Sequence, residues 1–388
     1  MYDALVIGGG PVGSYIAKGL ASKGHSVGVL EKGTVENKKI CCTGIISKNC
    51  YRSYLADKDL ILKNGRSAKV YSPSGKLLSI SHREDQAYII NRSALDSAMA
   101  ADAIGAGAEY FHKCTVKNLE IPKERIRIDY QKGSQFGTSE AKTVIIACGF
   151  NSGLFNKGID IGKTHNYTVG AQIEVHHRDV EGIEIYTGKH IAPGFFGWLV
   201  PLDDKKALVG LMSKYNPNKY LKGFLSLLKE RGKIDVNGDI PAYRGITQQP
   251  PKRTYGERFI VVGDAAGQVK PLTGGGIYFG LVCADIAVNN IDNALKDGDL
   301  RAVKLAAYEK EWKSRLNKEL RICRLARGIY SCLNNRQLDR IFNITNDSGI
   351  IDEIIASNEL DFDFHSRVIR KAIAFPMISK LLSRRVAR

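Results

Sequence analysis

Three glycines near the N-terminus have the spacing of a phosphate-binding turn. Gly8, Gly10 and Gly13 fit the pattern G-x-G-x-x-G. In such a turn the first glycine permits the tight bend, the second lets the backbone approach a pyrophosphate, and the third lets a helix pack closely on a strand. A helix beginning at Pro11 would direct its N–H groups and its partial positive charge toward the phosphates. The spacing therefore predicts that this turn binds a dinucleotide.

The segments around these glycines have the order strand, turn, helix and strand. Residues 3–7 are an apolar run suited to a buried parallel strand, residues 11–22 fit a helix, and residues 25–30 fit a second strand. Glu31 closes that strand about 20 residues past the glycines, where a carboxylate can accept both hydroxyls of an adenosine ribose. We predict that Glu31 and Lys32 contact the cofactor. The alternative is a glycine-rich turn in an ordinary βαβ unit.

A second glycine-rich segment follows another apolar run. Residues 258–262 fit a buried strand, and Asp264 comes at its C-terminal edge, where ligands bind in open α/β sheets. The Asp264 carboxylate can hydrogen-bond the sugar-alcohol chain of a flavin. Gly274–Gly276 leave the backbone bare against a flat ligand and begin a helix over 277–293, whose N-terminus would stabilise the negative charge of a reduced flavin. The alternative is a structural turn before a helix.

Together the two segments resemble the FAD-dependent oxidoreductases built like para-hydroxybenzoate hydroxylase. In that superfamily the first glycines hold the ADP half of FAD, and a strand-GD-x6-P-x2-G-x-G segment holds the ribityl chain and the ring. The residues here in or beside that segment are Gly263, Asp264, Pro271, Gly274, Gly275, Gly276 and Ile277. The resemblance implies FAD as cofactor. Because no second G-x-G-x-x-G with its strand and helix is present, we expect electrons from NAD(P)H docked without its own Rossmann unit, or from a reduced ferredoxin-type protein.

Two further segments resemble the geranylgeranyl reductases of this superfamily. Residues 193–201 read PGFFGWLVP and resemble the motif P-x-x-Y-x-W-x-F-P, whereas the family's following G-x-G has only its first glycine here, Gly210. Residues 41–47 read CCTGIIS and resemble the family's cysteine–glycine segment. The resemblance implies cofactor contacts from Cys42, Gly44, Arg92 and Gly149, and substrate contacts from Phe195, Phe196, Trp198 and Pro201.

Reduction of an isoprenoid double bond assigns a chemical role to Cys42. Reduced FAD supplies a hydride to one carbon, and a proton must reach the other. Because the olefin is not conjugated to a carbonyl, the proton donor has to be positioned with care, and a thiol or an ordered water could serve. We predict Cys42 as the catalytic residue. The alternative for Cys42 is an inert core cysteine. For Phe195, Phe196 and Trp198 the alternative is core packing of the substrate sheet, and for Arg92 it is a solvated position at the start of a helix.

The composition limits the cellular setting. The 388 residues are 44% hydrophobic, and no apolar run approaches the roughly 18 residues of a membrane span. The chain starts directly on a strand, without room for a signal peptide, and its eight cysteines form no C-x-x-C pair, so we expect a cytoplasmic protein with reduced thiols. The eight histidines show no ligand spacing, and we predict no metal.

The net charge of +17 indicates anionic partners. Residues 366–388 contain seven basic residues and no acid, interleaved with apolar ones. This mixture is typical of a basic amphipathic segment at the surface of an anionic membrane, and we expect peripheral contact with the inner face. The alternative is a terminal helix with a solvated basic face. Nucleic acid is not expected as a partner, because no nucleic-acid module accompanies the nucleotide fold.

These patterns predict an α/β fold. A Rossmann-type FAD-binding domain would be discontinuous, over 1–67, 91–165 and 251–298. An inserted α+β substrate domain with an antiparallel sheet would take 68–90 and 166–250. A helical C-terminal region would follow over 299–388.

Three classes of function remain open on the sequence. The favoured one is an FAD-dependent reductase that saturates geranylgeranyl chains on an isoprenoid lipid. The second is an FAD-dependent monooxygenase or halogenase of the same superfamily, although only Trp198 and Pro201 approximate the halogenase motif W-x-W-x-I-P. The third is a non-catalytic lipid-binding flavoprotein, against which the two intact cofactor motifs argue.

Overall fold

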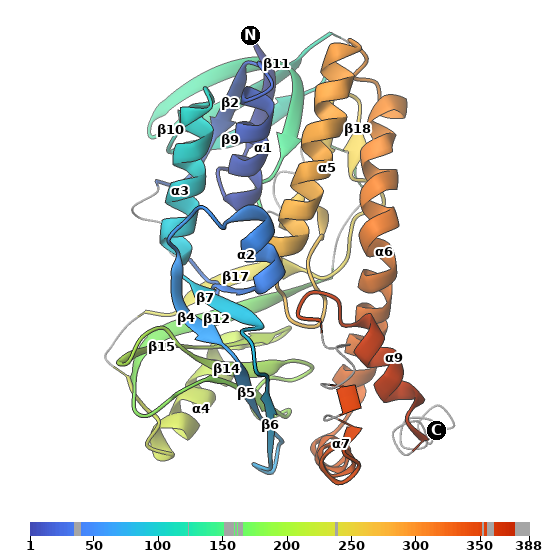
Figure 1. The fold of residues 1–388 in the computed structure, drawn as a ribbon. Coiled ribbons are helices and arrows are strands. Elements are labelled where there is room, and N and C mark those ends of the chain that lie inside the picture. The colour runs from blue at the N-terminus through green and yellow to red at the C-terminus, as the bar shows by residue number, and fades with distance from the viewer. Residues whose placement is uncertain are drawn as a thin grey trace.

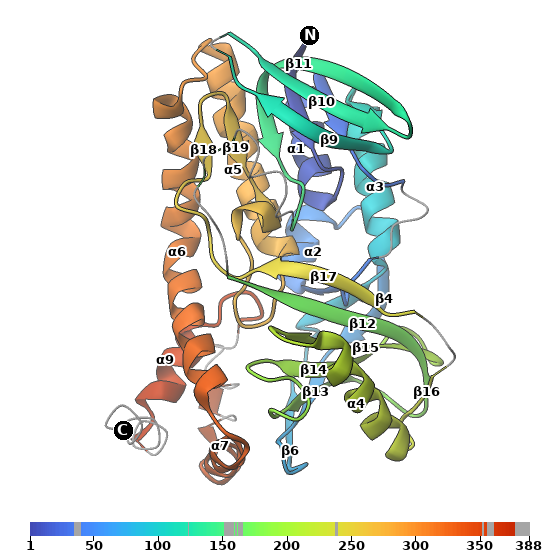
Figure 2. The same cartoon turned by 180° about the vertical axis from the view of Figure 1, so that it is seen from behind.

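Two eight-stranded sheets lie at opposite ends of the molecule, and long helices run along one side of both (Figures 1 and 2). The structure is a computed structural model. It describes residues 1–34, 40–122, 124–150, 159, 161, 166–236, 240–350, 353–354 and 361–376.

The first sheet contains the parallel strands that the apolar runs predict. Its order is β18-β19-β11-β1-β2-β8, and the pairs from β19 to β8 are parallel. The bounds are β1 Tyr2–Ile7, β2 Val27–Leu30, β8 Glu109–Phe111, β11 Gln135–Ile146, β18 Tyr255–Gly256 and β19 Phe259–Val261. Strands β9 (Cys114–Glu120) and β10 (Ile126–Lys132) form an antiparallel hairpin, and β10 also pairs with the start of β11.

The two faces of this sheet are covered differently. Ala4 and Val6 of β1 pack in a core with helices α1 (Pro11–Ala21) and α5 (Ile277–Lys296), and α3 (Arg92–Gly105) lies beside α1. Leu5 and Ile7 point the other way, into a core with β9 and β10. Burial on both faces explains why the strand reads as a continuous apolar run.

The second sheet is antiparallel over most of its width, as the alternating runs predict. Its order is β16-β12-β15-β14-β13-β5-β6, with β17 paired to β12. The bounds are β12 Tyr167–His177, β13 Ile183–Thr187, β14 Phe196–Pro201, β15 Lys206–Ser213, β16 Ile234–Asp235 and β17 Ala242–Thr247. Helix α4 (Pro217–Glu230) buries Leu221, Phe224 and Leu228 against one face.

The expectation that residues 68–90 add strands to this sheet is right for only part of the segment. Strands β5 (Ser67–Tyr71) and β6 (Leu77–Ser81) do join it. Strand β7 (Ala87–Ile90) instead pairs with β3 (Ile45–Ser47) and β4 (Ile61–Gly65) in a separate three-stranded sheet. The reason is burial: Ile90 packs in a core with α2 (Lys48–Tyr54), α3 and α5.

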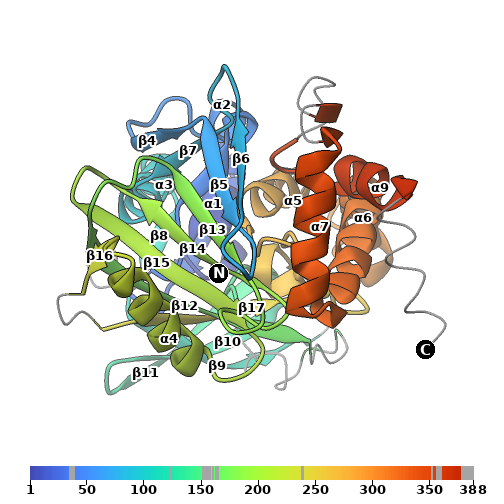
Figure 3. The ribbon, with the colours of Figure 1, turned by 90° about the horizontal axis from the view of Figure 1, so that it is seen from below.

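The C-terminal region over 299–388 is mainly helical in the described residues, as predicted. Helix α6 (Ala302–Cys332) packs beside α5 and reaches from the edge of the first sheet to the second sheet (Figure 2). Helices α7 (Asn335–Asp347) and α9 (Ser366–Ala374) gather around its C-terminal end (Figure 3). The last twelve residues of the predicted basic segment, 377–388, lie outside the described part. No helix of the described residues is long and apolar enough to cross a bilayer.

Candidate functional site

The first glycine turn joins β1 to α1 and packs against its own backbone and against the residues that follow β11. Gly8 has a φ of +106°, and a Cβ there would lie 2.5 Å from the carbonyl oxygen of Ala147. A Cβ on Gly13 would overlap the carbonyl oxygen of Gly8, so the helix packs directly on the turn. At Gly10, by contrast, none of the described atoms lies within 4 Å of the Cβ position. Packing therefore requires the outer glycines, whereas Gly10 leaves an open approach for a phosphate.

Glu31 is held beside this turn at the end of β2. Its Oε2 accepts a hydrogen bond of 2.6 Å from the Gly9 N–H, and its Oε1 accepts one of 2.9 Å from the Gly33 N–H. Among the described side chains, none caps the N-terminus of α1 and no acid lies in its first turn. The partial positive charge of this terminus is therefore available to a pyrophosphate. Lys32 is exposed next to Glu31.

The second glycine turn precedes α5 and lies against Asp264. Asp264 belongs to a short 3₁₀ turn, η2 (Gly263–Ala266), directly after β19. A Cβ on Gly276 would overlap its carboxylate, and none of the described side chains caps α5. Gly274 has a φ of +73°, and a Cβ there would lie 2.7 Å from the Met212 sulfur. At Gly275 a Cβ would lie 2.9 Å from the Lys270 side chain. The three glycines therefore pack against these side chains, beside a helix N-terminus that no described side chain caps.

The two turns meet at Val12, in the first turn of α1. A Cβ on Gly263 would lie 3.2 Å from Val12 Cγ2, and one on Gly280 would lie 2.6 Å from the same atom. Since Gly263 follows β19 and Gly280 lies in the first turn of α5, Val12 contacts both parts of the second segment. The predicted ADP side and the predicted ring side of the site are therefore in direct contact.

Arg244, on β17, is a cation that no sequence motif singles out. Its Nη2 lies 3.6 Å from Asp264 Oδ2. A Cβ on Gly149, which has a φ of +67°, would lie 2.5 Å from the same nitrogen. Gly149, Asp264 and Arg244 are therefore neighbours at the carboxyl edge of the first sheet. A guanidinium in this place is suited to bind a phosphate oxygen.

Arg92 begins α3, and its guanidinium lies beside Cys42 and Asp96. Nη1 donates to Asp96 at 2.7 Å, and Nε is buried with no hydrogen-bond partner among the described residues. Burial would lower the pKa of this guanidinium, but Cys42 and Asp96 raise it above its ordinary value. Gly44, with a φ of +70°, packs on the carbonyl of Ile90. A buried donor without a partner is costly, which fits a ligand acceptor at this point.

One face of the second sheet is turned toward these segments. Alternate residues on β14, β15, β12 and β17 form this face. In that order of strands they are Phe196 and Trp198, Gly210 and Met212, Gly170 and Gln172, and Arg244 and Ile246. Met212 and Ile246 lie against Gly274. Cys41 Sγ donates to the carbonyl of Gly170 at 3.7 Å, and burial raises the pKa of this thiol to about 11. The sheet therefore contacts both the cysteine segment and the second turn.

Gln172 links the predicted catalytic residue to the predicted substrate wall. Its Oε1 accepts a hydrogen bond of 3.3 Å from Trp198 Nε1, and its Nε2 donates one of 3.2 Å to the carbonyl of Cys42. A Cβ on Gly210 would lie 2.5 Å from the Trp198 indole, so this glycine makes room for the ring. Sequence reasoning missed Gln172, although a polar residue between Ala171 and Ile173 in an apolar strand was a usable signal.

The four predicted substrate residues do not lie together. Phe196 and Trp198 share the face described above, and their rings meet edge to face at 6.2 Å. Phe195 is buried before β14, with its ring against Arg327 of α6. Pro201, one residue out of the alternation, lines a separate pocket of about 230 Å³ with Ile89. The remaining predicted residues, Pro271 and Ile277, lie on either side of the second turn.

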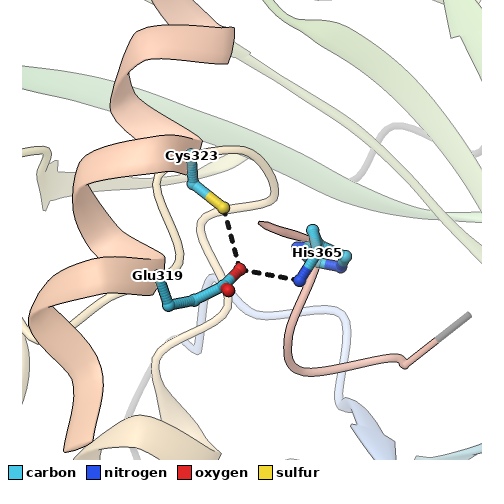
Figure 4. A group of neighbouring side chains, drawn as sticks. All are labelled: Glu319, Cys323 and His365. Atoms are coloured by element: carbon cyan, nitrogen blue, oxygen red, sulfur yellow. Dashed lines mark hydrogen bonds between the residues drawn. The ribbon is translucent and has the colours of Figure 1, made fainter. Parts of the chain in front are cut away.

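Glu319, Cys323 and His365 form a further group with the ligand types of a zinc site (Figure 4). Glu319 Oε1 accepts hydrogen bonds from the backbone N–H of His365 at 2.7 Å and from the Cys323 thiol at 3.0 Å. The Ser366 N–H donates to the same oxygen at 3.1 Å. Because backbone donors already occupy this carboxylate, we assign the group to capping α9.

The residues at the two turns fit FAD. An open backbone position lies over α1, a held carboxylate lies beside it, Arg92 offers a free buried donor, and α5 presents a bare N-terminus. The first feature suits a pyrophosphate, the carboxylate suits a ribose, the Arg92 donor suits a ligand oxygen, and the N-terminus of α5 suits a flat ring. The fold and the site define an FAD-dependent oxidoreductase.

The comparisons with known proteins specify the family. The chain is 31% identical to digeranylgeranylglycerophospholipid reductase 2 of Methanothermobacter thermautotrophicus over 356 residues, covering 88% of this chain and 90% of that protein. It is 30% identical to the digeranylgeranylglycerophospholipid reductase of Methanosarcina acetivorans, with 88% of each chain covered. The chain belongs to the digeranylgeranylglycerophospholipid reductase family. No family model matches it.

A solved structure agrees in fold. A geranylgeranyl bacteriochlorophyll reductase-like protein from Thermoplasma acidophilum superposes with a TM-score of 0.85 at 24% identity, covering 98% of each chain.

Proposed function

We propose that this protein uses reduced FAD to saturate C=C bonds in the geranylgeranyl chains of a membrane lipid. Its relatives are named as reductases of a digeranylgeranylglycerophospholipid. The observation that carries the proposal is the position of Trp198 and Phe196, on the sheet face that meets both Cys42 and the second glycine turn. An apolar wall in this place suits a prenyl chain laid beside the cofactor.

In this proposal, bound FAD supplies the hydride, and the chain's own residues place the olefin and provide the proton. Trp198 and Phe196 contact the prenyl chain and exclude water. Gln172 fixes the indole of Trp198 relative to the backbone of Cys42. The Cys42 thiol donates the proton to the carbon that does not receive the hydride, and Arg92 beside it stabilises the thiolate that remains.

The electron donor and the membrane contact belong to the same proposal. Either NAD(P)H or a reduced ferredoxin-type protein restores the flavin. Helix α9 exposes Arg367 and Arg370 and leaves Ile369 and Ile373 partly exposed, a pattern suited to an anionic lipid surface. Such peripheral contact would bring the site to a lipid that is itself anchored in the bilayer.

One anaerobic experiment tests the proposal. The purified yellow protein is reduced with dithionite, geranylgeranylated phospholipid is added, and the flavin absorbance is followed. We expect reoxidation of the flavin without oxygen, together with lipid that has gained two hydrogens per double bond. In a parallel reaction under air, incorporation of an oxygen atom into the lipid would identify a monooxygenase. Lipid binding without any change in the flavin would identify a carrier.

The role of Cys42 has its own test. We expect Cys42→Ala to bind FAD as the wild type does, because its contact with Gln172 uses the backbone carbonyl. The loss of a positioned proton donor should lower kcat roughly 100-fold, the usual scale for general acid catalysis. The exposed Cys332→Ala is the matched control, and turnover of Cys42→Ala at the control rate would remove Cys42 from the mechanism.

A further inference from the structure

Arg327 of α6 connects the two segments that the site brings together. Its Nε donates to the Pro271 carbonyl at 3.2 Å, and its Nη2 donates to the Leu272 carbonyl. Both carbonyls belong to the stretch that leads into the second glycine turn. Its Nη1 donates to the Gly194 carbonyl at 2.5 Å, which belongs to the aromatic segment before β14. One planar guanidinium therefore fixes the cofactor turn and the substrate segment to the same helix.

The same side chain also orders Phe195. The guanidinium carbon lies 3.8 Å from the centre of the Phe195 ring, a close cation–π contact. Tyr330, one turn further along α6, donates its hydroxyl to the Phe195 carbonyl at 2.9 Å. Phe195 is directly followed by Phe196 on the site face. A shift of Arg327 would therefore move the start of the substrate wall as well as the turn.

The positive charge of Arg327 lies among backbone carbonyls and aromatic rings. Among the residues that the structure describes, no carboxylate forms a salt bridge with it, and its partners are three backbone carbonyls and two rings. Burial lowers the pKa of this guanidinium to about 10, so it remains protonated at neutral pH. By contrast, Lys270 in the neighbouring stretch is neutralised by Asp363 at 2.9 Å. Arg327 thus leaves a net positive charge close to the second turn.

We propose that Arg327 is a positioning residue: it sets the second glycine turn and the aromatic segment in register, and its charge favours the reduced, anionic flavin. This inference rests on the proposed function, because the register matters for hydride transfer from the ring to the prenyl chain. The guanidinium is required rather than any cation, since only its planar fork reaches carbonyls of two segments at once. A lysine retains the charge but cannot make all three hydrogen bonds.

Three variants of the full-length holoprotein test this role. Arg327→Ala removes both the planar guanidinium and its charge, whereas Arg327→Lys keeps the charge. Arg324→Ala is the matched control, because among the described residues Arg324 donates a hydrogen bond only to Leu320 of its own helix. For each we would measure FAD affinity by flavin fluorescence, the midpoint potential of the flavin, and kcat and KM with geranylgeranylated phospholipid. Amide hydrogen exchange over residues 268–276 would report the order of the turn directly.

We expect Arg327→Ala to lower kcat roughly 10- to 100-fold, the fold-change that corresponds to losing one or two charge-assisted hydrogen bonds. Its flavin potential should become more negative, and exchange over 268–276 should become faster. Arg327→Lys should recover the potential but only part of kcat, and it also covers the case in which the alanine variant does not fold. Arg324→Ala should match the wild type in every measurement.

Two outcomes would overturn the inference. One is an Arg327→Ala protein that is less stable but, once loaded with FAD, has wild-type kcat and potential, because the contact would then be purely structural. The other is full recovery of kcat by Arg327→Lys, because the fork would then be unnecessary. If the wild type transfers no hydride to the lipid, the proposed function fails. The potential and the hydrogen exchange then decide the role of Arg327 at the turn, and unchanged values in Arg327→Ala would reject it.

Discussion

The two glycine turns would bind the two ends of one cofactor, yet they are held in different ways. The first is held mainly by the strand and helix next to it, since Gly13 packs on the carbonyl of Gly8 and Glu31 receives the N–H groups of Gly9 and Gly33, with one remote contact between Gly8 and the Ala147 carbonyl. The second depends on elements far along the chain. Met212 of β15 lies against Gly274, and Arg327 of α6 binds the carbonyls before it.

This difference predicts how each turn responds to a change elsewhere in the protein. A turn closed by neighbouring residues keeps its shape when other parts of the protein change. A turn held by a sheet and a helix responds to both. We therefore expect binding of the ADP half to depend mainly on residues 8–33, and the position of the ring to depend also on β15 and α6.

Gly13→Ala should have the largest effect on the first turn. The new Cβ would meet a backbone oxygen that has no room to move, and we expect the free energy of unfolding to fall by about 3 kcal/mol, the upper range for overpacking. The purified protein should retain little FAD. Chemical denaturation and the flavin absorbance measure the two effects.

Gly10→Ala is the control that separates packing from ligand approach. Because none of the described atoms lies near its Cβ position, stability without FAD should stay within about 0.5 kcal/mol of the wild type. FAD should nevertheless bind at least about 10-fold more weakly, since the methyl group enters the approach path of the phosphate. Wild-type FAD affinity in this variant would show that the phosphates lie elsewhere.

Gly274→Ala should have a smaller effect, with a remote component. The positive φ costs an alanine about 1 kcal/mol, and the contact with the Met212 sulfur adds to it. Adding Met212→Ala should remove the part of the destabilisation that comes from the contact with the sulfur, but not the part that comes from the positive φ. A double-mutant cycle on the free energies of unfolding would separate the two parts. Strict additivity would contradict our view that β15 shapes this turn.

Alkylation of Cys41 should have the smallest effect, and it reports on the contact between the cysteine segment and the second sheet. Burial raises the pKa of this thiol to about 11, so iodoacetamide at about pH 8 should modify it roughly 100-fold more slowly than an ordinary exposed cysteine. Cys332 is exposed and should react first, with no loss of stability. Peptide mass spectrometry gives the order, and rapid labelling of Cys41 would mean that this contact opens readily.

Much of the fold could be predicted because its signals are local. Buried parallel strands such as β1 and β19 appear in the sequence as apolar runs, and the spacing of the three glycines predicts the first turn. The prediction that β7 joins the second sheet is wrong, because an apolar run indicates that a strand is buried but does not indicate which core buries it. The domain boundaries remain a prediction.

Prediction of the candidate site from the sequence is limited for the same reason, because part of it depends on contacts between distant segments. Glu31 and Asp264 were predicted from their places after strands, and Arg92 from the resemblance to the superfamily. Arg244 and Arg327 were not, because an arginine in a strand or on a long helix has the same local signature whether it faces solvent or a site. Their places follow from pairings between segments that are distant in sequence, β12 with β17 and α6 with the second turn.

The contact of Val12 with Gly263 and Gly280 has a consequence for cofactor binding. This one branched side chain fills the space between the first turn and the residues that flank the second, so its size decides how closely the two segments approach. We expect Val12→Ile to push them apart and to weaken the binding of a ligand that must contact both, such as FAD.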